Sequence, residues 1–203
     1  MKLSATLTAA VATAVLVAAS PALAAPFGIA MGTPQSQLNI LRNVDETTAV
    51  KTYEISVPQP NSEISFYDVD LTAKTGVCRL IAFGTSHPGD DTGALVRSVY
   101  SSFKTALDGK YGKDEEFDYL NDGSKLTGPS QFAQGLNDNE RSLVTYWDSS
   151  TKAGLPSDIQ AISLEAEAVD GDSTYIVVTY EFSNYNDCAA QKPRDTSSDS
   201  KGL

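Results

Sequence analysis

The 203-residue sequence is poor in side chains that carry enzyme chemistry, with one histidine and two cysteines. Because His87 stands alone, the paired-histidine spacing of zinc sites is absent. The chain also has no serine-hydrolase G-x-S-x-G elbow, no P-loop, no dinucleotide glycine fingerprint and no basic-aromatic strip. The sequence therefore predicts no catalytic residue, no metal ligand set, no cofactor and no nucleic-acid partner.

The N-terminus has the pattern of an export signal. Lys2 precedes an almost uncharged stretch over residues 3–20, which Pro21 ends. The triplet at residues 22–24, Ala-Leu-Ala, is the small-x-small pattern that signal peptidase accepts, so we expect cleavage after Ala24. A membrane span needs roughly 20 apolar residues, and no Cys follows the cut to carry a lipid. We expect a signal peptide over residues 1–24 and a periplasmic or secreted chain without a stable membrane anchor.

The rest of the chain is acidic. After residue 24 it has 14 basic and 26 acidic residues, a net charge of −12. Such a surface repels phosphate backbones and anionic headgroups and favours a cationic partner, although it is also a common way to keep an exported protein soluble. The length predicts one domain over residues 25–188, and the polar run at 189–203 predicts a disordered tail.

Cys78 and Cys188 allow one intramolecular pairing. Disulfides persist in exported proteins, so we expect a structural bridge between these two residues. A redox-active pair normally has C-x-x-C spacing, which this chain lacks.

Alternating apolar residues predict strands, and apolar residues three and four apart predict helices. One helix is expected after Thr33 and Pro34, with Leu38, Leu41 and Val44 on its apolar side. A second helix is expected over residues 93–109. Strands are expected over residues 51–57, 65–71, 77–83, 142–147, 162–168 and 175–182. Residues 114–137 are expected to be irregular, with a helical turn after Pro129.

This order of elements predicts an α+β fold with two helices packed on one face of a largely antiparallel sheet. It also fits two related halves, each made of one helix and three strands. The two alternatives differ in whether the sheet is continuous.

Residues 28–38, Gly-Ile-Ala-Met-Gly-Thr-Pro-Gln-Ser-Gln-Leu, resemble the helix start of two families. These are the small outer-membrane assembly lipoproteins and the beta-lactamase inhibitor protein, which share a helix-then-sheet layout. The resemblance implies a protein-binding module. The chain differs from the lipoproteins in lacking their lipid-bearing Cys and in having residues 43–46 where they often have a glycine-proline turn.

Three segments contain candidate chemical groups. His87 lies beside Ser86, Asp90 and Asp91, but adjacent residues do not make a triad, so we interpret this segment as a solvated turn. Residues 118–124 resemble a calcium loop, yet Leu120 occupies a ligand position.

Glu165 and Glu167 alternate with apolar residues, as on the solvent-facing side of a half-buried strand. An aromatic group either lines a ligand surface or packs the core: Trp147, Tyr175, Tyr180, Phe182 and Tyr185.

The expected function is non-catalytic protein binding or inhibition, with another envelope or secreted protein as partner. The acidic charge favours a cationic partner. One alternative is a hydrolase that uses carboxylates of residues 115–122 or groups near His87. Another is a small-ligand carrier with a pocket between residues 93–109 and the sheet.

Overall fold

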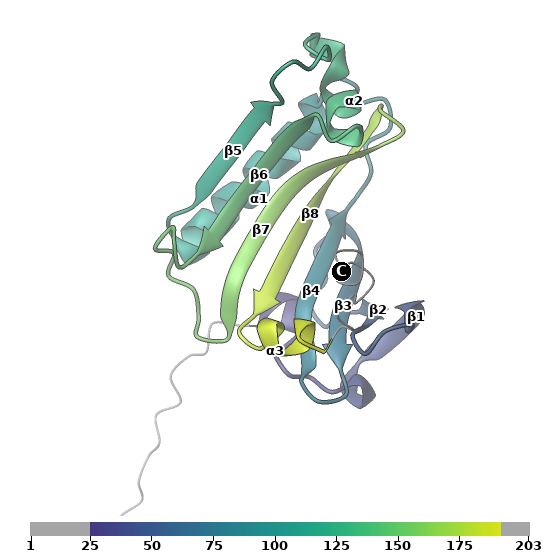
Figure 1. Ribbon diagram of the computed structural model, residues 1–203, viewed down its shortest axis with the longest axis vertical. Coiled ribbons are helices and arrows are strands. Elements are labelled where there is room, and N and C mark those ends of the chain that lie inside the picture. Colours follow the sequence, from purple (N-terminus) through teal and green to yellow (C-terminus); the bar gives the residue numbers. More distant parts are fainter. Residues whose placement is uncertain (1–24, 192–203) are drawn as a thin grey trace, which may run out of the picture.

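The computed structural model describes residues 25–191, so the expected signal peptide at 1–24 and residues 192–203 of the expected tail at 189–203 lie outside the described residues. Ala189 ends α3 and is therefore ordered, contrary to the expected start of the tail. The protein has a mixed α/β fold around an eight-stranded antiparallel sheet, in the order β1-β2-β3-β4-β8-β7-β6-β5 (Figure 1). The strands are β1 (Asn39–Asp45), β2 (Lys51–Ser56), β3 (Ile64–Thr72), β4 (Gly76–Gly84), β5 (Glu115–Leu120), β6 (Arg141–Asp148), β7 (Ile159–Val169) and β8 (Ser173–Phe182). The helices are α1 (Ala94–Tyr111), α2 (Phe132–Asn137) and α3 (Tyr185–Ala189).

The sheet joins two runs of sequential neighbours. Strands β1 to β4 follow one another at one side, and β5 to β8 follow one another at the other. The runs meet where β8 pairs with β4, with Ile81 opposite Thr179. The sheet is therefore continuous and has four strands in each run, not three, and a duplication of the chain is not confirmed.

One face of the sheet carries the core. Alternate residues of the central strands are buried there, including Leu80, Leu164 and Val178, as the period of two in a strand requires. Helix α1 packs on β7 and β8 with an apolar stripe that includes Val96 and Tyr100. At the far end of this core, Phe27, Ile29, Leu38 and neighbouring side chains of the N-terminal segment join the same cluster.

The predicted helix at residues 93–109 is confirmed as α1, whose first turn is fixed by Asp90 and Gly93. Gly93 has a φ of 71°, and a Cβ placed on it would lie 2.0 Å from the Phe132 ring. Asp90 is 3% exposed and accepts hydrogen bonds from the amides of Leu95 and Val96. These contacts satisfy amides that have no partner inside the helix.

The expected helix after Pro34 is wrong. The chain makes only a short turn at Gln35–Gln37 and then enters β1. Leu41 is 61% exposed, so the apolar residues of this segment do not form a buried helical stripe. Pairing with β2 instead satisfies the backbone of the segment.

The expected irregular segment also contains a strand, β5, which pairs with β6 along its whole length. Its side chains are exposed or half-buried on both faces, so the alternation that reveals a strand is missing. The helical turn expected after Pro129 is confirmed as a 3-10 turn that leads into α2.

The three helices contact different strands. Helix α1 contacts β7 and β8, α2 contacts β6 and β7, and α3 contacts β4. Figure 1 shows α1 behind the sheet and α2 at one end of it. The expectation that the helices form one layer on one face is therefore not confirmed. None of the helices described for residues 25–191 is long and apolar enough to cross a membrane.

The predicted disulfide between Cys78 and Cys188 is confirmed. Cys78 lies in β4, and Cys188 lies in α3, which follows β8. Both residues are buried, and 110 positions separate them in the sequence. The bridge fastens the end of the described chain to the middle of the sheet.

Candidate functional site

The candidate site is the sheet face that points away from α1, which we call the open face. Cross-strand partners point to the same side of a sheet, so the strand register identifies its side chains. Val144, for example, stands between the buried Leu143 and Thr145 and therefore points away from the core. Residues paired with Val144 on the neighbouring strands belong to the open face as well.

A largely apolar row crosses the open face. It contains one residue from each of six adjacent strands, in cross-strand register from β3 to β5: Phe66, Phe83, Val177, Glu165, Val144 and Phe117. We call it the central row. Phe66 and Phe83 stack with ring centroids 4.4 Å apart. Phe117 is exposed and meets the Tyr146 ring at 6.2 Å. The only charged member of the row is Glu165.

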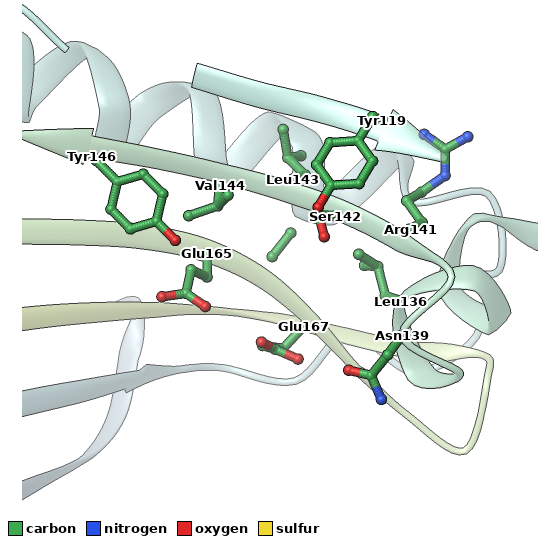
Figure 2. A pocket seen from close by; sticks show the side chains of 11 residues that line it. Tyr119, Leu136, Asn139, Arg141, Ser142, Leu143, Val144, Tyr146, Glu165 and Glu167 are labelled. Carbon is green, nitrogen blue, oxygen red and sulfur yellow. The ribbon is translucent and has the colours of Figure 1, made fainter. Parts of the chain in front are cut away.

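A cavity of about 230 Å³ lies beside the central row, above β5, β6 and β7. Figure 2 shows two tyrosines on its walls, Tyr119 and Tyr146, together with the carboxylates of Glu165 and Glu167. Asn139, just beyond α2, lines the cavity at one end. We call this hollow the acidic cavity.

The two carboxylates of the acidic cavity lack a cation. Within residues 25–191, no Lys, Arg or His nitrogen forms an ion pair with Glu165 or Glu167. Burial and the charge of Glu165 raise the pKa of Glu167. Burial, Glu165 and Tyr119 similarly raise the pKa of Tyr146. The cavity therefore concentrates negative charge that the protein itself does not neutralise.

Arg141 also lines the acidic cavity, but its guanidinium pairs elsewhere through Nη1, while its buried Nε has no hydrogen-bond partner among the described residues. Its Nη1 lies 3.1 Å from a carboxylate oxygen of Asp118. Its guanidinium carbon lies 5.1 Å from the centre of the Phe132 ring. Arg141 is thus held by its own partners and leaves the two glutamates unpaired.

A second hollow, of about 320 Å³, lies at the other end of the central row. Its walls are mostly apolar and include Phe66, Phe83, Val169 and Tyr175. Tyr175 is the cross-strand partner of Glu167, so this apolar hollow and the acidic cavity are neighbours on the sheet. The open face therefore places an apolar site next to an anionic one.

The remainder of the open face is also acidic. Its two cations are paired, Arg42 with Glu54 and Arg79 with Asp70. Asp68 is 7% exposed, and its Oδ1 has no hydrogen-bond partner among the described residues. Burial, reinforced by the charge of Glu54, raises the pKa of Asp68. Among the described residues, Asp68 is therefore a further carboxyl group of the open face that forms no ion pair.

The structure does not assemble a reactive site around His87. The backbone of His87 pairs with that of Thr174 as an isolated bridge. Asp90 is not part of a solvated turn but is buried under the start of α1, where the Thr174 hydroxyl donates to it at 2.7 Å. Burial alone would raise the pKa of Asp90, but its hydrogen bonds with Val96, Thr174 and Leu95 hold the pKa below its ordinary value.

The carboxylates of residues 115–122 lie on β5 and the turn after it. Asp118 pairs with Arg97 and Arg141, while Glu116 lies 3.9 Å from Lys104. These groups serve to fasten the edge strand to α1 and β6. Within residues 25–191, no cluster of three or more His, Cys, Asp or Glu residues is placed to hold a metal ion.

The aromatic group named from the sequence divides between core and surface. Trp147, Tyr180 and Phe182 are buried in the core, whereas Tyr175 belongs to the open face. The interpretation of Glu165 and Glu167 as the less buried side of a strand is confirmed by their half-buried positions. The sequence did not reveal that Phe117 and Tyr119 join them, because β5 itself was not recognised.

Comparison of the chain with family models, with characterised proteins and with solved structures gave no match. The resemblance of residues 28–38 to envelope proteins is therefore untested and stays a prediction.

Proposed function

We propose that this chain is an exported, non-catalytic protein-binding or inhibitor module, and that the open face is its binding surface. The observation that carries the proposal is the central row, a line of apolar and aromatic side chains left on a sheet face that α1 does not cover. Aromatic residues with polar groups around them are typical of the centre and rim of protein interfaces.

The size of the open face suits a protein partner. Six strands at about 4.8 Å spacing give the central row a width of about 24 Å. Rows of side chains lie on both sides of it, for example the row through Ile81, Thr179 and Tyr146. Standard protein interfaces cover about 800 Å² per partner, a patch of comparable dimensions.

Two observations support export and a cationic partner. The Cys78–Cys188 disulfide is of a kind that persists in oxidising compartments, which favours the periplasm or the extracellular space. The unpaired carboxylates of the acidic cavity give the binding surface a charge that a cationic protein would complement.

The proposal is tested by affinity capture from a crosslinked envelope extract with residues 25–203 as bait. A Phe117→Ser, Tyr146→Ser variant changes the open face, and Leu95→Ser changes an exposed apolar residue of α1 as a matched control. We expect one protein to be recovered in stoichiometric amount with the native bait and the Leu95 variant but not with the open-face variant. Equal recovery with all three baits would contradict the assignment of the surface, and recovery with none would contradict the function.

A further inference from the structure

We propose that the acidic cavity is the subsite for an arginine side chain of the partner, which inserts between Tyr119 and Tyr146 and pairs with Glu165 and Glu167. This inference rests on the proposed function and adds the chemistry of the group that the partner presents. It assigns to the cavity one occupant, a guanidinium carried on a cationic protein segment.

The carboxylates are arranged to share one cation. Glu165 and Glu167 stand two residues apart on β7 and point to the same side of the sheet, so their Cα atoms are about 7 Å apart. A planar guanidinium has five N–H donors in a fixed fork and can reach both carboxylates at once. Burial and the charge of Glu165 disfavour the ionised form of Glu167 in the free protein, as its raised pKa indicates. A cation bound between the two carboxylates would offset the repulsion between them.

The tyrosines favour arginine over lysine. Tyr119, 49% exposed, and Tyr146 project from β5 and β6 beside the two carboxylates (Figure 2). A guanidinium stacks on an aromatic face while its edge makes ion pairs, whereas an ammonium is a compact and strongly hydrated charge. The protein uses this chemistry internally, since Arg141 lies over the Phe132 ring and pairs with Asp118.

A protein segment explains the neighbouring surface better than a free small cation does. The apolar hollow at Phe83 and Tyr175 adjoins the acidic cavity, so an occupant of both needs an apolar group beside its guanidinium. A polypeptide presents such neighbours along one chain. The exposed Phe117 at the other side of the cavity adds a further apolar contact.

The test uses residues 25–203 labelled with nitrogen-15 and titrated with N-acetylarginine amide. N-acetylcitrulline amide, which has nearly the same shape and no charge, is the matched probe. We expect the arginine compound to shift the amide resonances of residues 142–146 and 165–167, and the citrulline compound to leave them in place. Similar shifts with both compounds, or none with the arginine compound at tens of millimolar, would overturn the proposal.

Two double variants give the second arm of the experiment. Glu165→Gln with Glu167→Gln removes the pair from the acidic cavity, whereas Glu63→Gln with Asp187→Asn removes two exposed carboxylates elsewhere. We expect the first variant to weaken arginine binding at least about tenfold, the equivalent of about 1.4 kcal/mol, and the second to change it less than about twofold. An equal loss of arginine affinity in both variants would show that only the net charge of the protein matters, and would refute the subsite.

The same variants separate this inference from the function on which it rests. If the captured partner is lost with the Phe117, Tyr146 variant but fully retained with the Glu165, Glu167 variant, the arginine subsite is wrong and the binding surface stands. If no partner is captured by any bait, the proposed function fails, whatever the probe titration shows.

Discussion

Replacement of Asp90 by alanine is expected to lower the free energy of unfolding by about 3 kcal/mol. The Asp90 carboxylate accepts hydrogen bonds from the Leu95 amide at 3.0 Å, the Val96 amide at 2.9 Å and the Thr174 hydroxyl at 2.7 Å. Loss of a helix-capping acceptor costs about 1 kcal/mol. The buried Thr174 hydroxyl also loses its hydrogen-bond acceptor, which costs about 1 to 3 kcal/mol more.

Urea unfolding at pH 7 measures this loss, with Asp91→Ala as the neighbouring control. In the described part of the chain the Leu95 amide, the Val96 amide and the Thr174 hydroxyl donate to Asp90 and not to Asp91. Replacement of Asp91 is therefore expected to change the free energy of unfolding by less than about 0.5 kcal/mol. For a chain of this size the Asp90 variant corresponds to a drop in Tm of roughly 6 to 12 °C. A loss under about 1 kcal/mol, or equal losses at both positions, would refute the assigned role.

The Asp90 contribution is also expected to depend on pH. Its pKa in the folded protein is lowered, so the ionised carboxylate stabilises the fold above its unfolded pKa of about 3.9. This stability is lost as the pH falls from there through the folded pKa. The difference between the native protein and Asp90→Ala should therefore shrink below about pH 4, and a difference that grows on acidification would contradict the account.

Three further changes test the packing and the site. Tyr100→Phe removes the hydroxyl that lies 2.6 Å from the buried Thr145 hydroxyl, and should lower the free energy of unfolding in urea by about 1 to 3 kcal/mol. An unchanged free energy of unfolding would contradict this contact. Gly93→Ala combines a positive φ with a clash against Phe132 and should cost at least about 2 kcal/mol. Glu167→Gln should stabilise the fold at pH 7, since the Glu167 pKa is raised, and this gain should vanish below about pH 4. Destabilisation at pH 7 would show that the carboxylate supports the fold.

The elements that could be predicted from the sequence are those in which apolar residues recur at a regular spacing, because one side of the element packs on the core. The apolar stripe of α1 and the alternation in β7 and β8 arise because one side of each element is buried. The disulfide followed from having two cysteines and one possible pairing. The periodic patterns can be read within a short stretch of sequence, and two cysteines can form only one intramolecular pair.

Edge strands were not predictable in the same way. Strand β1 has exposed Leu41 and Val44 at a spacing that also fits a helix. The expected cap at Thr33 is wrong, because its hydroxyl donates to the Ala30 carbonyl and the short turn at Gln35–Gln37 has no side-chain cap. Strand β5 is exposed on both faces. For both edges the deciding factor is pairing with a neighbouring strand, which is a tertiary contact that no local pattern records.

The candidate site could not be predicted from the sequence, because it too depends on how the strands pair. Its members come from strands far apart in the sequence, and only the register places Phe66, Glu165 and Phe117 in one row. The alternation of Glu165 and Glu167 was visible and correctly indicated an outward side. What that side faces depends on the strand order, with β8 inserted between β4 and β7.

The central claim, that the open face binds a protein, is tested most directly by site-specific photo-crosslinking. A photoreactive benzoylphenylalanine is placed at Tyr146 on the open face or at Leu95 on α1, both of which are exposed. We expect position 146 to crosslink one partner protein in the cell envelope and position 95 to crosslink none. Crosslinking of the same protein from position 95 alone, or equally from both positions, would contradict it.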